Sequence, residues 1–192
     1  FDDKKVREAF SFCLDYESVV NDIIGGGQVA AGPVPRNMGA HNDEVPVSTQ
    51  DPERAQQALE ESGYTAEEIN QLEVTYFSME GNPVFRQTGL LLQSNVSEIL
   101  GIDIKVETVP WTRIAESNTA PDSTPHLQPV YQTAKFPSPY GHTHLMWHPD
   151  AFGNYSSAHW YEDEEIVQTL NEARSEPDAE ARTELYKEAQ ML

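Results

Sequence analysis

Positive charge and cysteine are scarce in this sequence. Its 192 residues carry 12 lysines and arginines against 32 aspartates and glutamates, which gives a net charge of −20. A protein that binds nucleic acid needs a basic surface against the phosphates, so this composition argues against nucleic acid as a partner. Cys13 is the only cysteine, so it has no disulfide partner in the chain, and we interpret it as a small buried apolar residue.

Long apolar runs and the motifs of common catalytic sites are also absent. No stretch reaches the roughly 20 apolar residues that span a bilayer. The sequence has no Gly-x-Ser-x-Gly elbow, no His-Glu-x-x-His motif and no phosphate-binding loop, since the glycines at 25–27 follow a predicted helix instead of a strand. Paired acids such as Glu60 and Glu61 lie on predicted solvent-exposed helix faces. Two carboxylates act as a general acid and a general base only when their surroundings give them different pKa values, and an exposed face does not do so. We therefore predict neither an enzyme nor a cofactor.

Lysine is especially rare, with only five in the chain, at positions 4, 5, 105, 135 and 187. A surface rich in carboxylates and poor in lysine suits a protein that stays soluble at very high salt, where screening removes self-repulsion. We therefore predict a halophilic source. The acids are scattered among apolar and aromatic residues, so the chain is expected to fold and not to be disordered.

The hydrophobic pattern predicts an α/β fold around one βαβ unit. Apolar residues alternate over 72–79, follow helical spacing over 84–100 and alternate again over 102–106. A strand, a helix and a second strand in this order pack as right-handed parallel neighbours. Residues 126–134 have the composition of a strand, and Pro129 within them favours an edge or irregular one.

Capping residues and glycines mark the other helices. Residues 1–24 form one helix, or two with a bend near Asp15, because this aspartate can cap a second start. Asp51 and Pro52 begin a helix that Gly63 ends. Further helical segments are predicted over 65–71, 111–118, 163–174 and 178–192, and a long ordered loop over 28–50.

Three separated stretches also match one known family, in the order that the family has them. They are FDDKKVREAFSFCLDYE at 1–17, DPERA followed by GY at 51–64, and LNEAR followed by LY and AQ at 170–190. Together they resemble the peptide/nickel solute-binding proteins that serve ABC importers. The resemblance implies a class II periplasmic-binding-protein-like lobe, with a mixed sheet and a βαβ unit flanked by helices. Residues 1–192 would then form a single domain, the second (C-terminal) lobe of a longer protein whose first lobe is absent here.

The same resemblance implies a function in transport. The lobe would bind peptides or similarly extended small solutes, together with the first lobe of the same chain. Closure of the two lobes around the ligand would be recognised by an ABC permease of the membrane. The implied location is extracytoplasmic, either periplasmic or at the cell surface, with the full-length protein anchored to the membrane.

Residues 135–161 form the strongest candidate for the solute site. Aromatic side chains and prolines crowd this stretch, as an apolar wall with a few placed polar groups requires. In the family, an acid just before a proline that matches Pro139 helps to hold a peptide's amino terminus, but Ser138 stands at that position here. The alternative is that the aromatic residues only pack a long loop. The predicted ligand-binding residues are Lys135, Phe136, Tyr140, Trp147, Asn154, Tyr155 and Trp160.

Histidines in the same stretch raise a metal alternative. His144 and His148 are four residues apart, so they share a face if the segment is helical, as zinc or nickel ligands do. His142, His159 and Asp150 lie nearby, but the spacing fits no standard motif, and the favoured interpretation is local hydrogen bonding. The resembled family includes nickel importers, so one alternative is a nickel or other metal-complex binding protein of the same family. The chain could also be an acidic interaction module without a small-molecule site, or part of a hydrolase whose nucleophile lies outside this sequence.

Overall fold

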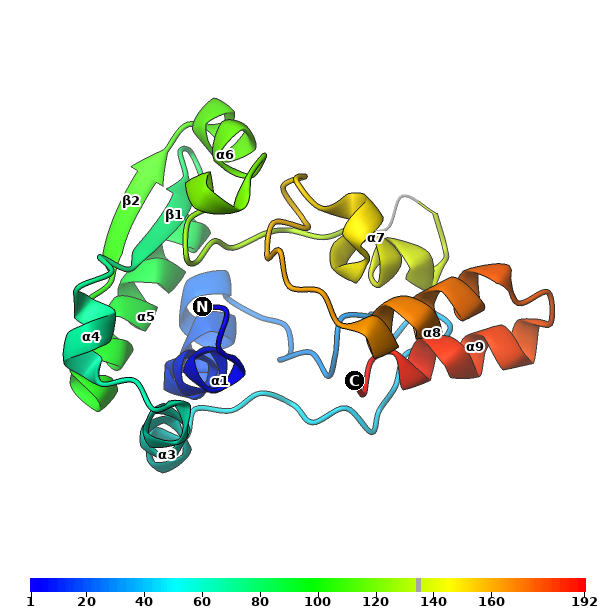
Figure 1. The fold of residues 1–192 in the computed structure, drawn as a ribbon, viewed down its shortest axis with the longest axis horizontal. Helices are drawn as coiled ribbons and strands as arrows, with labels where there is room; N and C mark the ends of the chain where they lie inside the picture. The colour runs from blue at the N-terminus through cyan, green and yellow to red at the C-terminus, as the bar shows by residue number, and fades with distance from the viewer. Residues whose placement is uncertain (134–135) are drawn as a thin grey trace. The chain divides into compact units, whose positions relative to one another are not determined.

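A computed structural model describes residues 1–133 and 136–192 (Figure 1). By their internal contacts these residues divide into two compact units, each built from several chain segments. The first unit comprises Phe1–Val29, Ser48–Ser117 and Pro125–Pro129, and the second comprises Ala30–Val47, Asn118–Thr124 and Val130–Leu192. The part of the chain that the structure describes contains no helix of the length and apolar character needed to cross a membrane.

The first unit opens with two successive helical segments, as the second of the two sequence alternatives expected. Asp3 caps α1 (Lys4–Cys13) by accepting a hydrogen bond from the Val6 N–H at 3.0 Å. Asp15 caps α2 (Tyr16–Ser18), which continues into a π-helical turn over Val19–Ile24. The turn has no buried residue, although four of its six residues are valine or isoleucine. The wider i→i+5 turn carries side chains off the 3.6-residue stripe.

The predicted βαβ unit is confirmed. Strands β1 (Thr75–Met79) and β2 (Lys105–Val109) pair in parallel, with Thr75 opposite Lys105 and Met79 opposite Val109. Helix α5 (Pro83–Leu100) connects them and packs against both strands (Figure 1). The second strand begins three residues later than its alternation predicted. Ile102 and Ile104 are buried in the core, but they precede the ladder.

The remaining helices of the first unit complete its core. They are α3 (Pro52–Ser62), capped by Asp51 as predicted, α4 (Ala66–Asn70) and α6 (Trp111–Ser117). Cys13 is fully buried, as expected, and burial raises the pKa of its thiol to about 12. The buried apolar core consists of Val6, Ala9, Phe10, Cys13, Ala55, Ala58, Ile69, Val74, Tyr76, Leu92, Val96, Leu100, Ile102 and Ile104.

The strand predicted over 126–134 is wrong for its described residues. Only a single parallel bridge, between Leu127 and Tyr76, forms there. The Phe77 N–H donates to the Leu127 carbonyl, and the Leu127 N–H donates to the Thr75 carbonyl, both at 3.0 Å. Pro129 has no N–H to donate, which limits further pairing beyond this bridge.

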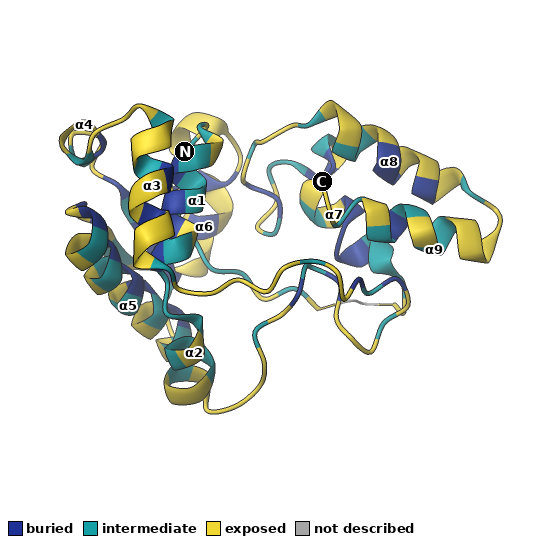
Figure 2. Cartoon of the chain, turned by 90° about the horizontal axis from the view of Figure 1, so that it is seen from below, coloured by how far each residue is buried: buried dark blue, intermediate teal, exposed yellow. Residues whose placement is uncertain are grey.

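The second unit is built around a helical hairpin. Helices α8 (Glu164–Ser175) and α9 (Ala179–Glu188) pack together through Leu170, Ala173 and Tyr186, with Ala40 from the long loop. Figure 2 shows buried residues on one side of α8 and mainly exposed ones along α9. The hairpin confirms the two C-terminal helices that the sequence predicted.

The long loop of the second unit is held by hydrogen bonds to the C-terminal residues. Asn42 Nδ2 donates to the Lys187 carbonyl at 3.1 Å, and Gln190 Nε2 donates to the Ala40 carbonyl at 2.7 Å. The loop is therefore ordered, as predicted. The same unit contains the short helix α7 (His144–Trp147), between the 3₁₀ turns Pro139–Gly141 and Pro149–Ala151, and a further 3₁₀ turn over Pro121–Ser123.

Candidate functional site

The candidate ligand-binding residues lie in the second unit, apart from Lys135, which is outside the described residues. Tyr140 lies in the 3₁₀ turn Pro139–Gly141 and Trp147 is the last residue of the short helix α7, whereas the other described candidates lie outside helical turns. Phe136, Trp147 and Tyr155 are each 39–47% exposed, while Tyr140 and Trp160 are half-buried. The segment thus presents large aromatic surfaces at more than one point.

The first group of rings is a stack that starts at the predicted site residue Tyr140. Its ring lies 4.6 Å from that of His144 at an angle of 16° between the planes, and the His144 ring lies 4.0 Å from that of His148 at 8°. Phe136 approaches Tyr140 from a greater distance, 6.4 Å between ring centroids. Tyr140 therefore belongs to a packed stack, and Phe136 is its exposed neighbour.

The second group of rings gathers around His159 and Phe152. The His159 ring lies 5.0 Å from that of Trp147 and 5.1 Å from that of Phe152, which in turn lies 5.7 Å from Trp160. The structure thus brings Trp147 and Trp160 into one network with Phe152, which sequence reasoning missed. Phe152 follows a proline turn, and nothing in its spacing distinguishes it from a loop residue.

Trp160 is held in an unusual backbone conformation. Its φ of 55° lies in the left-handed region, which is costly for a bulky side chain. The indole Nε1 donates to Thr124 Oγ1 at 2.8 Å, and this bond helps to fix the ring. Strained residues of this kind cluster at binding and switch sites, which keeps Trp160 among the candidates.

Two amides in this unit differ sharply in their bonding. Asn154 uses both ends of its side chain locally, since Oδ1 accepts from Ser156 and Nδ2 donates to the Ala151 carbonyl. Asn118 is fully buried, and neither its Oδ1 nor its Nδ2 has a hydrogen-bond partner among the described residues. Sequence reasoning missed Asn118, because an asparagine directly after a helix gives no signal of its burial.

Three side chains that could hold a metal ion converge beside α7. Asp150 Oδ2 lies 3.5 Å from His148 Nδ1 and 4.0 Å from His144 Nε2. Burial lowers the pKa of His144 to about 4, with further contributions from His148 and Arg174, so this imidazole is neutral near pH 7. His142 is also buried, and burial lowers its pKa, but it is not a member of this group.

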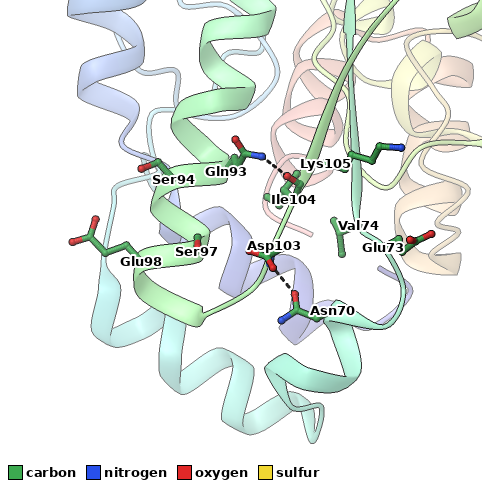
Figure 3. A pocket seen from close by; sticks show the side chains of 10 residues that line it. All are labelled: Asn70, Glu73, Val74, Gln93, Ser94, Ser97, Glu98, Asp103, Ile104 and Lys105. Carbon is green, nitrogen blue, oxygen red and sulfur yellow. Dashed lines mark hydrogen bonds between the residues drawn. The ribbon is translucent and has the colours of Figure 1, made fainter.

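A hollow of about 830 Å³ lies in the first unit (Figure 3). It is found at the amino ends of the strands, whereas ligands of open α/β sheets bind at the carboxyl ends. Two of its polar side chains are already engaged, as Gln93 donates to the Ile104 carbonyl and Asn70 accepts from the Asp103 N–H. We therefore regard it as a surface groove and not as the solute site. Its lining residues are Asn70, Glu73, Val74, Gln93, Ser94, Ser97, Glu98, Asp103, Ile104 and Lys105.

Comparison with known proteins identifies the family. Residues 1–154 match the bacterial extracellular solute-binding proteins, family 5 middle. The chain belongs to this family. Among curated relatives, the oligopeptide-binding protein AppA of Bacillus subtilis is 25% identical over 200 residues, which cover 98% of this chain and 36% of that protein. The dipeptide-binding protein of Escherichia coli is 27% identical over 205 residues, which cover 100% and 35% respectively.

A solved structure shares the fold of this chain. The oligopeptide-binding protein AppA of Bacillus subtilis, in complex with a nonapeptide, matches with a TM-score of 0.82 at 24% identity. This match covers 100% of the present chain and 39% of the solved AppA chain. The helix-rich α/β fold with its small parallel sheet is thereby confirmed. The chain spans about 35% of the length of the curated relatives it matches.

The family match also divides the candidate residues. Phe136, Tyr140, Trp147 and Asn154 lie within the matched region of the family 5 domain, which ends at residue 154. Tyr155 and Trp160 lie just beyond it, although the relatives' alignments cover nearly the whole chain. The domain is related to an oligopeptide-binding and a dipeptide-binding protein, and the names of both relatives describe binding and not catalysis.

Proposed function

We propose that the chain is the second, C-terminal lobe of a longer extracytoplasmic protein that binds peptides for an ABC permease. One observation supports this most strongly. The whole chain matches a peptide-bound structure of the same fold, but it accounts for only 39% of that structure. The rest of the binding protein, including the first lobe, would then come from other parts of the same polypeptide, and a membrane anchor would hold it near the permease.

The proposed mechanism is closure of two lobes around the ligand. In this lobe the exposed rings of Phe136, Trp147 and Tyr155 would cover the ligand's apolar side chains, while the strained Trp160 provides a fixed wall. A rigid aromatic wall loses little conformational entropy on binding, which favours affinity. Lys135 remains part of this proposal, although it lies outside the described residues.

Recognition of the peptide's amino terminus would differ from that in the family. Ser138 stands where the resemblance expects an acid, and its hydroxyl oxygen accepts from the Tyr140 N–H at 3.3 Å. A neutral hydroxyl already used in a turn attracts an ammonium group far less than a carboxylate does. We therefore propose ligands that are held mainly along their length, with a smaller contribution from a free α-amino group.

A tyrosine pair tests the proposed site. In the full-length protein, Tyr155→Ala is expected to weaken peptide binding about tenfold, because an exposed ring at the site contributes as an aromatic hot spot. Tyr64→Ala removes a ring of similar exposure, 47% against 41%, from the first unit and should leave affinity unchanged. Isothermal titration calorimetry with a mixed-length peptide series measures both variants. Equal affinities in the two variants would remove Tyr155 from the site.

The acidic composition supports a second proposal, that the source is halophilic. Exposed carboxylates at the starts of α8 and α9, such as Glu164, Glu165 and Glu180, add to the net charge of −20. We expect far-ultraviolet circular dichroism to show partial unfolding at low ionic strength and recovery in molar sodium chloride, since screening weakens the repulsion. A spectrum that does not change with salt would contradict this origin.

A further inference from the structure

His144 is a deeply buried imidazole that makes no hydrogen bond through its ring. Its side chain is 2% exposed, and its Nδ1 is buried without a partner among the described residues. The Nε2 atom lies 4.0 Å from Asp150 Oδ2, which is too far for a hydrogen bond. His148 differs, because its Nδ1 accepts from the Asp150 N–H at 3.1 Å, and only its Nε2 is buried without a partner among the described residues.

The other nitrogens of the two rings, His144 Nε2 and His148 Nδ1, are the ones that approach Asp150. From His144, His148 and Asp150, one potential donor atom each lies within 4.8 Å of the other two. Two imidazole nitrogens and one carboxylate oxygen are a donor set that suits zinc, nickel and copper ions. We propose that these three side chains form a binding site for a divalent transition-metal ion.

Binding would require the donor atoms to draw together from separations of up to 4.8 Å. With bonds of about 2.0–2.2 Å, tetrahedral ligand atoms lie about 3.3 Å apart. Asp150 Oδ2 is 3.5 Å from His148 Nδ1 and 4.0 Å from His144 Nε2, so both gaps close within an ångström. The stacked rings must also tilt, because nearly parallel planes do not direct two lone pairs at one point. His148 Nδ1 must in addition release the Asp150 N–H, which donates to it at 3.1 Å.

The local fold allows both this access and this adjustment. All three residues come from one short stretch of the second unit, α7 and the turn Pro149–Ala151 (Figure 1). The Asp150 side chain is 69% exposed, so an ion can reach the site from solvent. The fourth position would be taken by water or by a solute.

Occupancy would have a consequence for the aromatic wall. Trp147 lies between the two histidines in sequence and is the last residue of α7. An ion bound by His144 and by the following turn would tie both ends of this helix together and fix the backbone that carries Trp147. The binding of the ion itself does not depend on the proposed peptide function.

Calorimetric titration of the full-length protein with zinc chloride, and separately with nickel chloride, tests this site. After removal of adventitious metal with a chelator, we expect a saturable site that His148→Ala and Asp150→Asn each weaken about tenfold or more. Asp150→Asn is an exposed, nearly isosteric change, so it keeps the test valid even if His148→Ala folds poorly. His142→Ala removes a neighbouring buried histidine outside the group and should retain the affinity.

Two outcomes would overturn the proposal. The first is the absence of saturable binding of either ion by the wild-type protein. The second is binding with the same affinity and stoichiometry in the Asp150→Asn, His148→Ala and His142→Ala variants, which would place the ion elsewhere. Circular dichroism of each variant confirms that the comparison is made between folded proteins.

Discussion

Replacing Leu170 with alanine is expected to lower the free energy of unfolding of the second unit by about 2–5 kcal/mol. Leu170 is 1% exposed and forms a small core with Ala40, Ala173 and Tyr186. Two of these three buried partners are alanines, which end at Cβ and cannot fill the cavity that the truncation leaves, although Ile166 and Leu185 also pack against this core. Urea denaturation followed by circular dichroism measures the loss as an earlier transition of this unit.

A leucine on a helix surface provides the matched control. Leu90 lies on α5 and is 37% exposed, so Leu90→Ala should change the unfolding free energy by no more than about 0.5 kcal/mol. Both substitutions remove the same atoms from a helix, and only burial distinguishes them. Equal losses in the two variants would show that the α8–α9 hairpin does not have the packed core described above.

Gly89→Ala is expected to destabilise the first unit by about 2 kcal/mol, although alanine is the better helix former. A Cβ at Gly89 would lie 2.4 Å from Cε1 of the Tyr76 ring, far inside van der Waals contact. That ring cannot move freely, because Tyr76 is 4% exposed and its hydroxyl donates to the Phe85 carbonyl at 2.9 Å. The measurement is again urea denaturation.

Two further variants make the cause of this loss testable. Gln87→Ala, at an exposed position of the same helix, should be neutral or slightly stabilising by propensity alone. Combining Gly89→Ala with Tyr76→Ala should cost less than the sum of the two single changes, because the clash is relieved once the ring is absent. Strict additivity would contradict a direct clash between residue 89 and the ring.

The sequence was sufficient for those parts of the fold that depend on local chemistry. Aspartates cap the N-termini of α1, α3, α8 and α9, and glycines cap the C-termini of α3 and α5. These caps act within one turn, so their residues are visible to a reader of the sequence. The βαβ unit was predictable as well, because hydrophobic period and handedness leave few ways to arrange it.

Features that depend on register or on distant contacts were not predictable. The alternation over 102–106 correctly indicated that Ile102 and Ile104 are buried. Strand pairing begins only at Lys105, because the register of the two strands places Lys105 opposite Thr75. The π-helical turn over Val19–Ile24 uses the same residue types as an α-helix and leaves no signal.

The candidate site shows the same division. Its aromatic richness was visible in the sequence, and so was the i, i+4 spacing of His144 and His148. The division of the rings into two networks, the positive φ of Trp160 and the unpaired amide of Asn118 were not, because each depends on how the turns fold back on one another. Tertiary packing, and not local propensity, decides such contacts.

Native mass spectrometry of the full-length protein tests the central claim most directly. The protein should first be mixed with a peptide digest that covers a range of lengths and then transferred to a volatile buffer of high ionic strength. The account predicts a bound species heavier by the mass of one peptide, which dissociates when the protein is activated or unfolded. A protein that emerges without any bound peptide, while remaining folded, would contradict the proposed peptide-binding function and favour an acidic interaction module.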